Sequence, residues 1–154
     1  MLGQLNASHM GLSSSANQKV TQKNSTGLLG IEGKHSKQGF KISAVIPDSP
    51  AYRNESKLSI GDTIVAVNQK SLDEYNLYDL LNGQANTPVL LTIKPQDSKK
   101  MKDVVIWPTT SLRNELYDQW VNERRQLTDK FSGGRLGYLH IRGMNWSSFE
   151  RFER

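Results

Sequence analysis

Apolar and polar residues alternate along the chain between residues 29 and 46. Leu29 and Ile31 lie two positions apart, and after a polar segment the apolar positions again recur at every second residue: Phe40, Ile42, Ala44 and Ile46. A period of two is typical of a strand with one buried face. We therefore expect two antiparallel strands, joined by the polar segment 33–39.

Three more apolar runs are short enough to be strands. They cover residues 64–67, 89–93 and 104–107, and Pro95 ends the second of them. The residues before Gly27 show no strand pattern, so we expect the sheet to take its remaining edge from the run at 104–107. The pattern thus predicts an antiparallel sheet whose last strand comes from the end of the domain.

A short helix is predicted between these strands. It runs to residue 82 and carries apolar residues at helical spacing: Leu77, Leu80 and Leu81. Its start is open between two possibilities. Ser71 with Glu74 forms a capping box, and Asn76 is a good N-cap by itself.

A second helical segment follows the last strand. Its apolar positions are Leu112, Leu116, Trp120, Leu127 and Phe131. Ser111 can cap its start, and Gly133 with Gly134 would end it. After it we expect a strand at 136–141 and the beginning of a helix at 146–152, which find nothing to bury against within this chain. The pattern indicates a connecting helix over 109–134 and the start of an α/β core over 135–154.

Composition narrows the function classes. The net charge of +5 comes from basic residues interleaved with acids, which favours a solvated surface over nucleic-acid binding. No apolar run approaches the roughly 20 residues that a membrane-spanning helix needs. The chain has no cysteine, and neither His35 nor His140 has partners at metal-ligand spacing, so we expect no metal and no cofactor. Residues 12–26 are rich in serine, asparagine, glutamine and lysine, which predicts a flexible linker.

The best candidate for a binding site is the glycine-bracketed stretch at 27–31. Glycine permits backbone conformations that turn successive N–H groups toward one point, where they bind a terminal carboxylate. We expect the amides of Leu28, Leu29 and Gly30 to do this, while the following strand pairs with the peptide. The groove would lie between this strand and the short helix. Its predicted lining residues are Gly27, Leu28, Leu29, Gly30, Ile31, Tyr78 and Leu81.

Three motifs in sequence order resemble the PDZ family. They are the glycine loop at 27–31, the Ser-Pro-Ala step at 49–51, and the Gly-Asp turn at 61–62, which leads into a buried strand and an Asn-x-Lys turn. The resemblance implies that residues 27–108 form a PDZ domain. Its fold would be α+β, a partly open antiparallel β-barrel or sandwich with flanking helices. The late edge strand is similar to the circularly permuted PDZ domains of bacterial-type proteases.

The flanking segments resemble tricorn proteases. Trp120-Val121 and then Arg125 lie in the connecting helix, and Gly-Tyr-Leu-His-Ile follows at 137–141. The family's usual ending departs here to Arg142-Gly143. Within residues 1–11, Asn-Ala-Ser-His at 6–9 is similar to the segment that delivers the catalytic histidine. The resemblance implies a serine-type peptidase that degrades oligopeptides and is related to C-terminal processing peptidases.

The same resemblance assigns chemical roles. His9 would be the general base and Ser8 would orient it, and histidine suits this task because its unperturbed pKa is about 6.5. The nucleophilic serine and the oxyanion-hole amides would lie downstream, so we expect the present chain to be inactive alone. The resemblance further implies a peptide or protein substrate, a homo-oligomeric parent enzyme and a cytoplasmic location, with a periplasmic location as the alternative.

Three alternatives remain open at this stage. Ser8-His9-Met10 also matches the residues that a cloning site leaves behind. The chain could be a stand-alone PDZ adaptor for C-terminal peptides, although the partial core at 135–154 favours the protease. The groove could be open, or its own chain could block it.

Overall fold

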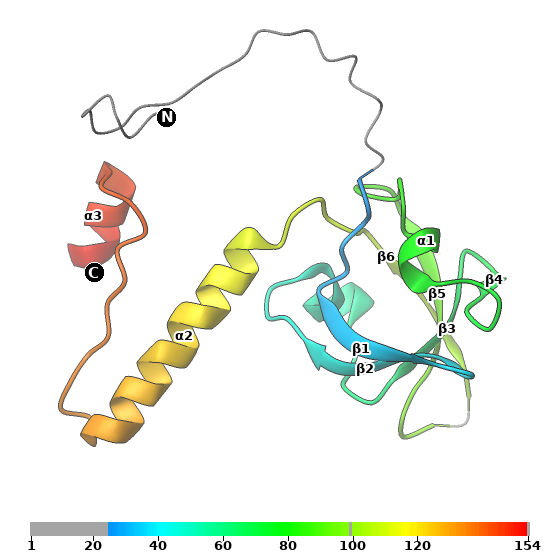
Figure 1. Cartoon of the computed structure of the whole chain (residues 1–154), viewed down its shortest axis with the longest axis horizontal. Helices are drawn as coiled ribbons and strands as arrows, with labels where there is room; N and C mark the ends of the chain where they lie inside the picture. Colours follow the sequence, from blue (N-terminus) through cyan, green and yellow to red (C-terminus); the bar gives the residue numbers. More distant parts are fainter. Residues whose placement is uncertain (1–24, 99, 154) are drawn as a thin grey trace, which may run out of the picture.

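The computed structural model describes residues 25–98 and 100–153. Ser8, His9 and residues 12–24 of the expected linker lie outside this range. A sheet domain comes first, and a long helix projects away from it (Figure 1). The segment after this helix turns back along it toward the C-terminus (Figure 1). In the described part of the chain, every helix is too short or too polar to span a bilayer.

The sheet is antiparallel and contains six strands among the described residues. They are β1 (Ile31–Ser36), β2 (Gly39–Val45), β3 (Thr63–Val67), β4 (Lys70–Ser71), β5 (Val89–Lys94) and β6 (Lys102–Ile106). Their order is β1-β2-β3-β5-β6, and β4 pairs with β3 alone. The expected late strand therefore forms one edge. Leu28 bridges to Thr109 beyond β6, which brings the two ends of the sheet together and partly closes it.

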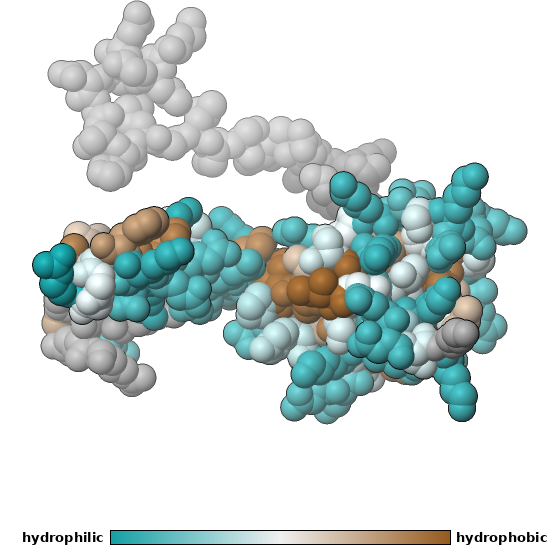
Figure 2. All heavy atoms as spheres, turned by 90° about the horizontal axis from the view of Figure 1, so that it is seen from below, coloured by the Kyte–Doolittle hydropathy of each residue, from teal (hydrophilic) through white to brown (hydrophobic). Residues whose placement is uncertain are grey.

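The core of the domain gathers on one face of this sheet. Fourteen buried apolar residues form a single cluster: Leu29, Phe40, Ile42, Ala51, Leu58, Ile64, Val67, Leu72, Leu77, Leu81, Val89, Leu91, Ile93 and Ile106. Strands β2, β3 and β5 supply half of them. These contacts confirm the α+β sheet domain that the pattern predicts. The surface around the core is mostly hydrophilic, apart from an apolar patch beside the start of the helical arm (Figure 2).

The first hairpin differs from the expectation of a loop at 33–39. Strand β1 continues to Ser36, and only Lys37 and Gln38 form the turn. The pairing of His35 with Phe40 and of Ser36 with Gly39 continues the ladder. The sequence pattern missed this extension because the end of β1 exposes side chains on both faces, which removes the alternation.

The short helix α1 (Leu77–Leu80) is a single turn. Asn76 caps it, since the side-chain oxygen of Asn76 accepts a hydrogen bond from the Tyr78 N–H at 2.9 Å. Ser71 instead accepts from the Asp73 N–H within a local turn. The helix ends before the expected residue 82, because the chain turns through Gly83 at a φ of 74°. Two residues of the expected linker pair here, with Ser25 accepting from the Gly83 N–H and Thr26 bridging Asn82.

Two single-turn 3-10 helices, Pro50–Tyr52 and Asn54–Ser56, connect β2 to β3. The long helix α2 (Arg113–Ser132) ends as predicted at Gly133, which adopts a left-handed φ of 61°. The N–H of Gly134 then donates to the Asp129 carbonyl at 3.0 Å. A final helix, α3 (Trp146–Glu153), follows.

The strand expected at 136–141 does not form. A strand needs a partner for its backbone groups, and none of the described residues pairs with this segment. The segment instead packs on α2 through aromatic contacts. The Tyr117 hydroxyl lies 2.8 Å from His140 Nδ1, and the Trp120 and His140 rings meet edge to face at 4.9 Å.

Asp62 joins two parts of the sheet at the turn before β3. Its carboxylate is buried, with 4% of the residue exposed. One oxygen accepts from the Ser59 N–H and the other from the Gln96 N–H, each at 3.1 Å. Gly61, with a φ of 92°, makes the turn that brings Asp62 inward.

We expect the Asp62→Ala substitution to lower the free energy of unfolding by about 2 kcal/mol, because two partly buried hydrogen bonds to the buried Asp62 carboxylate are lost. Urea denaturation followed by circular dichroism measures this change. Asp73→Ala, at an exposed position, serves as the matched control. Equal stability of the two variants would contradict a structural role for the Asp62 carboxylate.

Candidate peptide-binding site

A small pocket lies between the glycine loop and α1. Its volume is about 60 Å³, and its lining residues are Gly27, Leu28, Leu29, Gly30, Ile31, Leu77, Tyr78, Leu81 and Leu112. The structure thus brings all seven predicted peptide-site residues to one place. Sequence reasoning missed Leu77 and Leu112, which were assigned only to the apolar faces of helices. The role of the pocket in binding stays a prediction.

The Ser-Pro-Ala step lies beneath the loop and helps to hold its conformation. The Leu29 carbonyl accepts from the Ala51 N–H at 2.9 Å, and the Gly30 carbonyl accepts from the Ile46 N–H at 2.8 Å. The buried Ser49 hydroxyl also donates to the Gly30 carbonyl, at 3.3 Å. Both loop carbonyls are therefore turned toward the body of the domain.

Gly30 cannot carry a side chain in this arrangement. Its φ is 83°, and an added Cβ would lie 2.1 Å from the Ser49 Cβ. Both the left-handed backbone and the close approach require glycine. The sequence pattern indicated the first of these two grounds, the backbone conformation of Gly30. The second, the close contact with Ser49, comes from the structure.

The amides of the loop divide into two groups. The Leu28 N–H donates to the Thr109 carbonyl at 2.8 Å, so the expectation that this amide holds a carboxylate is wrong for this conformation. The N–H groups of Leu29 and Gly30 have no hydrogen-bond partner among the described residues. These two neighbouring amides belong to residues that line the pocket.

The opposite wall is tied to β1 by His35. The Leu77 N–H at the start of α1 donates to His35 Nε2 at 3.1 Å, which requires a neutral ring with its proton on Nδ1. The Phe40 ring meets both His35 and Tyr78 edge to face, with centroid distances of 5.6 Å and 6.2 Å. His35 thus acts as a helix cap, a role that its place in a polar hairpin did not predict.

Tyr78 keeps 52% of its surface exposed while it lines the pocket. Tyr75 does not line it, and the Lys70 ammonium instead lies 5.9 Å from the centre of the Tyr75 ring. Of these two tyrosines, Tyr78 in α1 lines the pocket and Tyr75, which precedes α1, does not.

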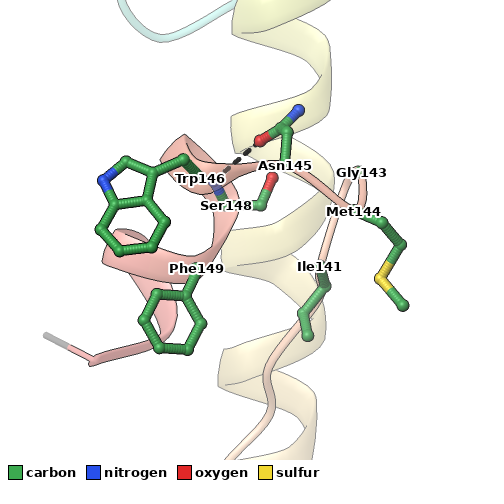
Figure 3. Close-up of a pocket in the computed structure, with 7 residues that line it drawn as sticks. All are labelled: Ile141, Gly143, Met144, Asn145, Trp146, Ser148 and Phe149. Atoms are coloured by element: carbon green, nitrogen blue, oxygen red, sulfur yellow. Dashed lines mark hydrogen bonds between the residues drawn. The ribbon is translucent and has the colours of Figure 1, made fainter.

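A larger hollow of about 570 Å³ lies near the C-terminus and is lined by Ile141, Gly143, Met144, Asn145, Trp146, Ser148 and Phe149. Figure 3 shows Trp146 and Phe149 on one side and Met144 extending away on the other. Asn145 caps α3 by accepting from the Ser148 N–H at 2.9 Å. Among the described residues, those that line this hollow carry no titratable side chain.

Comparison with known proteins places the chain in a family. The model of the PDZ domain matches residues 17–94, which includes the glycine loop, the Ser-Pro-Ala step and α1. Tricorn protease homolog 1 from Streptomyces coelicolor is 33% identical over 138 residues, covering 81% of this chain and 13% of that protein. A tricorn protease homolog from Saccharolobus solfataricus is 29% identical over 140 residues, covering 84% of this chain and 13% of that protein.

A solved structure shows the same fold. The crystal structure of the tricorn protease aligns with a TM-score of 0.68 at 20% identity, over 82% of this chain and 13% of that one. The chain therefore spans only about an eighth of the length of these relatives. The chain belongs to the PDZ domain family, and it resembles the PDZ-domain region of the tricorn-type proteases.

Proposed function

We propose that the sheet domain binds the C-terminal end of a peptide, which adds as a strand beside β1. The observation that carries this proposal is the pair of Leu29 and Gly30 amides, which have no partner among the described residues and lie beside an apolar pocket. Two adjacent N–H donors suit the two oxygens of a carboxylate. The last side chain of the peptide would enter the pocket.

The edge of the sheet supports the direction of binding. In the described part of the chain, β1 pairs with β2 on one side and with no strand on the other. Its outer backbone groups can therefore form a ladder with an extended peptide. The peptide would lie between β1 and α1, with Tyr78 above its end.

We further propose that this domain positions substrate within a tricorn-type serine protease that degrades oligopeptides. The similarity to the Streptomyces coelicolor relative covers 81% of the chain, whereas the PDZ match covers residues 17–94 alone. This longer similarity favours a protease over a stand-alone adaptor. In this proposal His9 is the general base, Ser8 orients it, and the nucleophile lies outside this chain, which is inactive alone. We also propose that the full-length enzyme is a homo-oligomer located in the cytoplasm.

We expect a peptide with a free C-terminus to shift the NMR signals of Leu29, Gly30, Ile31 and Tyr78, and amidation of the peptide to weaken binding about tenfold or more. The physical reason is that amidation removes the charge which the two loop amides would receive. Titration of the 154-residue chain with both peptides measures the difference.

The loop itself provides the matched variants for this test. Gly30→Ala should abolish binding, because the new Cβ would collide with Ser49 and the amides would turn. Gly137→Ala should leave binding unchanged, because a Cβ there meets no atom within 4 Å. Affinities that do not respond to amidation would instead indicate recognition of internal sequence.

In the full-length enzyme, His9→Ala should lower kcat by about a thousandfold or more, because loss of the base leaves only the oxyanion hole and substrate binding. Ser8→Ala should cost less, since water can replace the orienting hydroxyl. Steady-state hydrolysis of a fluorogenic peptide measures both, with circular dichroism to confirm folding. A natural gene without this Ser-His pair, or an active His9→Ala enzyme, would place the base elsewhere.

A further inference from the structure

One wall of the peptide pocket comes from outside the sheet. Leu112 lines the pocket together with the glycine loop and α1, although it lies beyond β6, directly before α2. Leu77 and Leu81 at the base of the pocket are buried, with 0% and 1% exposed. Leu112 therefore adds to the pocket lining a residue that belongs neither to the loop nor to α1.

The segment before α2 holds Leu112 in place. Leu28 and Thr109 exchange two backbone hydrogen bonds, at 2.8 Å and 2.9 Å, so the segment is tied to the glycine loop itself. The Thr109 hydroxyl donates to the Ser111 carbonyl at 3.2 Å. The Leu112 carbonyl then accepts from the Leu116 N–H at 2.9 Å in the first turn of α2. These bonds make Leu112 a fixed part of the pocket wall.

The remaining space is small. Its volume of about 60 Å³ is well below the roughly 150 Å³ of an engineered cavity that binds benzene. The side chains of alanine and valine fit such a space, whereas a phenylalanine side chain does not. The apolar lining also disfavours a charged side chain, because burial would remove its hydration without a partner.

We propose that Leu112 sets the specificity of the site by restricting the last residue of the peptide to a small apolar side chain, alanine or valine. The inference rests on the proposed function, since it concerns the same pocket. Leu112 acts by excluding larger side chains, and the loop amides supply the carboxylate recognition common to all ligands.

Fluorescence polarisation with labelled peptides tests this inference on the full 154-residue chain. The peptides share one sequence and end in alanine, valine or phenylalanine with a free carboxylate, and an amidated alanine peptide is added. We expect the wild type to bind the alanine and valine peptides about tenfold or more tighter than the phenylalanine peptide. In Leu112→Ala, binding of the phenylalanine peptide should strengthen by about tenfold, with no gain for the alanine peptide.

Two further variants make the result specific. Leu116→Ala removes a 48% exposed leucine one turn further along α2, outside the pocket, and should keep the wild-type preference. Leu112→Trp fills the pocket and should weaken the alanine and valine peptides about tenfold or more. Circular dichroism shows whether Leu112→Ala folds. If it does not, Leu112→Trp still tests the role of residue 112, because it makes the pocket smaller instead of larger.

The outcomes separate the inference from the proposed function. The proposed function stands if peptides with a free carboxylate bind better than the amidated peptide. If Leu112→Ala nevertheless discriminates against the phenylalanine peptide as strongly as the wild type does, the proposed role of Leu112 is wrong. The same holds if Leu112→Trp binds like the wild type. If the wild type binds none of the peptides while Leu112→Ala does, Leu112 is a block and not a selector. If amidation has no effect in any variant, both proposals fail.

Discussion

The close contact between Gly30 and Ser49 is the constraint on which the candidate site depends. A Cβ at residue 30 would lie 2.1 Å from the Ser49 Cβ, so only glycine permits the loop to rest on the buried Ser-Pro-Ala step. From that position the loop carbonyls accept hydrogen bonds from Ile46 and Ala51. In a trans peptide unit the N–H points opposite to the carbonyl. Because the Leu29 carbonyl accepts from Ala51, the Gly30 N–H of the same unit points away from Ala51. The Leu29 N–H likewise points away from Thr109, which donates to the Leu28 carbonyl. The carboxylate site that we propose thus depends on how the loop packs.

A second constraint links the sheet domain to the helix that follows it. The paired backbone groups of Leu28 and Thr109 join the start of the glycine loop to the segment before α2. This pairing uses the Leu28 amide, which the sequence made a candidate ligand group, and it brings Leu112 to the pocket. The candidate site therefore includes a residue of the segment between β6 and α2.

The sequence pattern predicted a strand correctly where one face of that strand is buried. Strand β2 lies where the alternation predicts it, and β5 lies where the apolar run at 89–93 predicts it. The pattern did not predict the end of β1, because both faces of that segment are exposed and its side chains do not alternate between apolar and polar. The expected strand at 136–141 failed for a different reason. Its residues are compatible with a strand, but a strand exists only when another backbone pairs with it, and no described segment does so.

The features that depend on neighbouring residues could be predicted from the sequence: the glycine loop, the left-handed stop at Gly133 and the buried strands. Local backbone preferences and periodicity encode these directly. For the start of α1 the sequence offered two caps, and the structure shows that Asn76 is used. The tertiary structure decided which groups at the site are free and which are used. The Leu28 amide meets Thr109, and the His35 ring caps Leu77, across 42 residues. Such contacts depend on which surfaces meet after folding, and no local pattern in the chain records them.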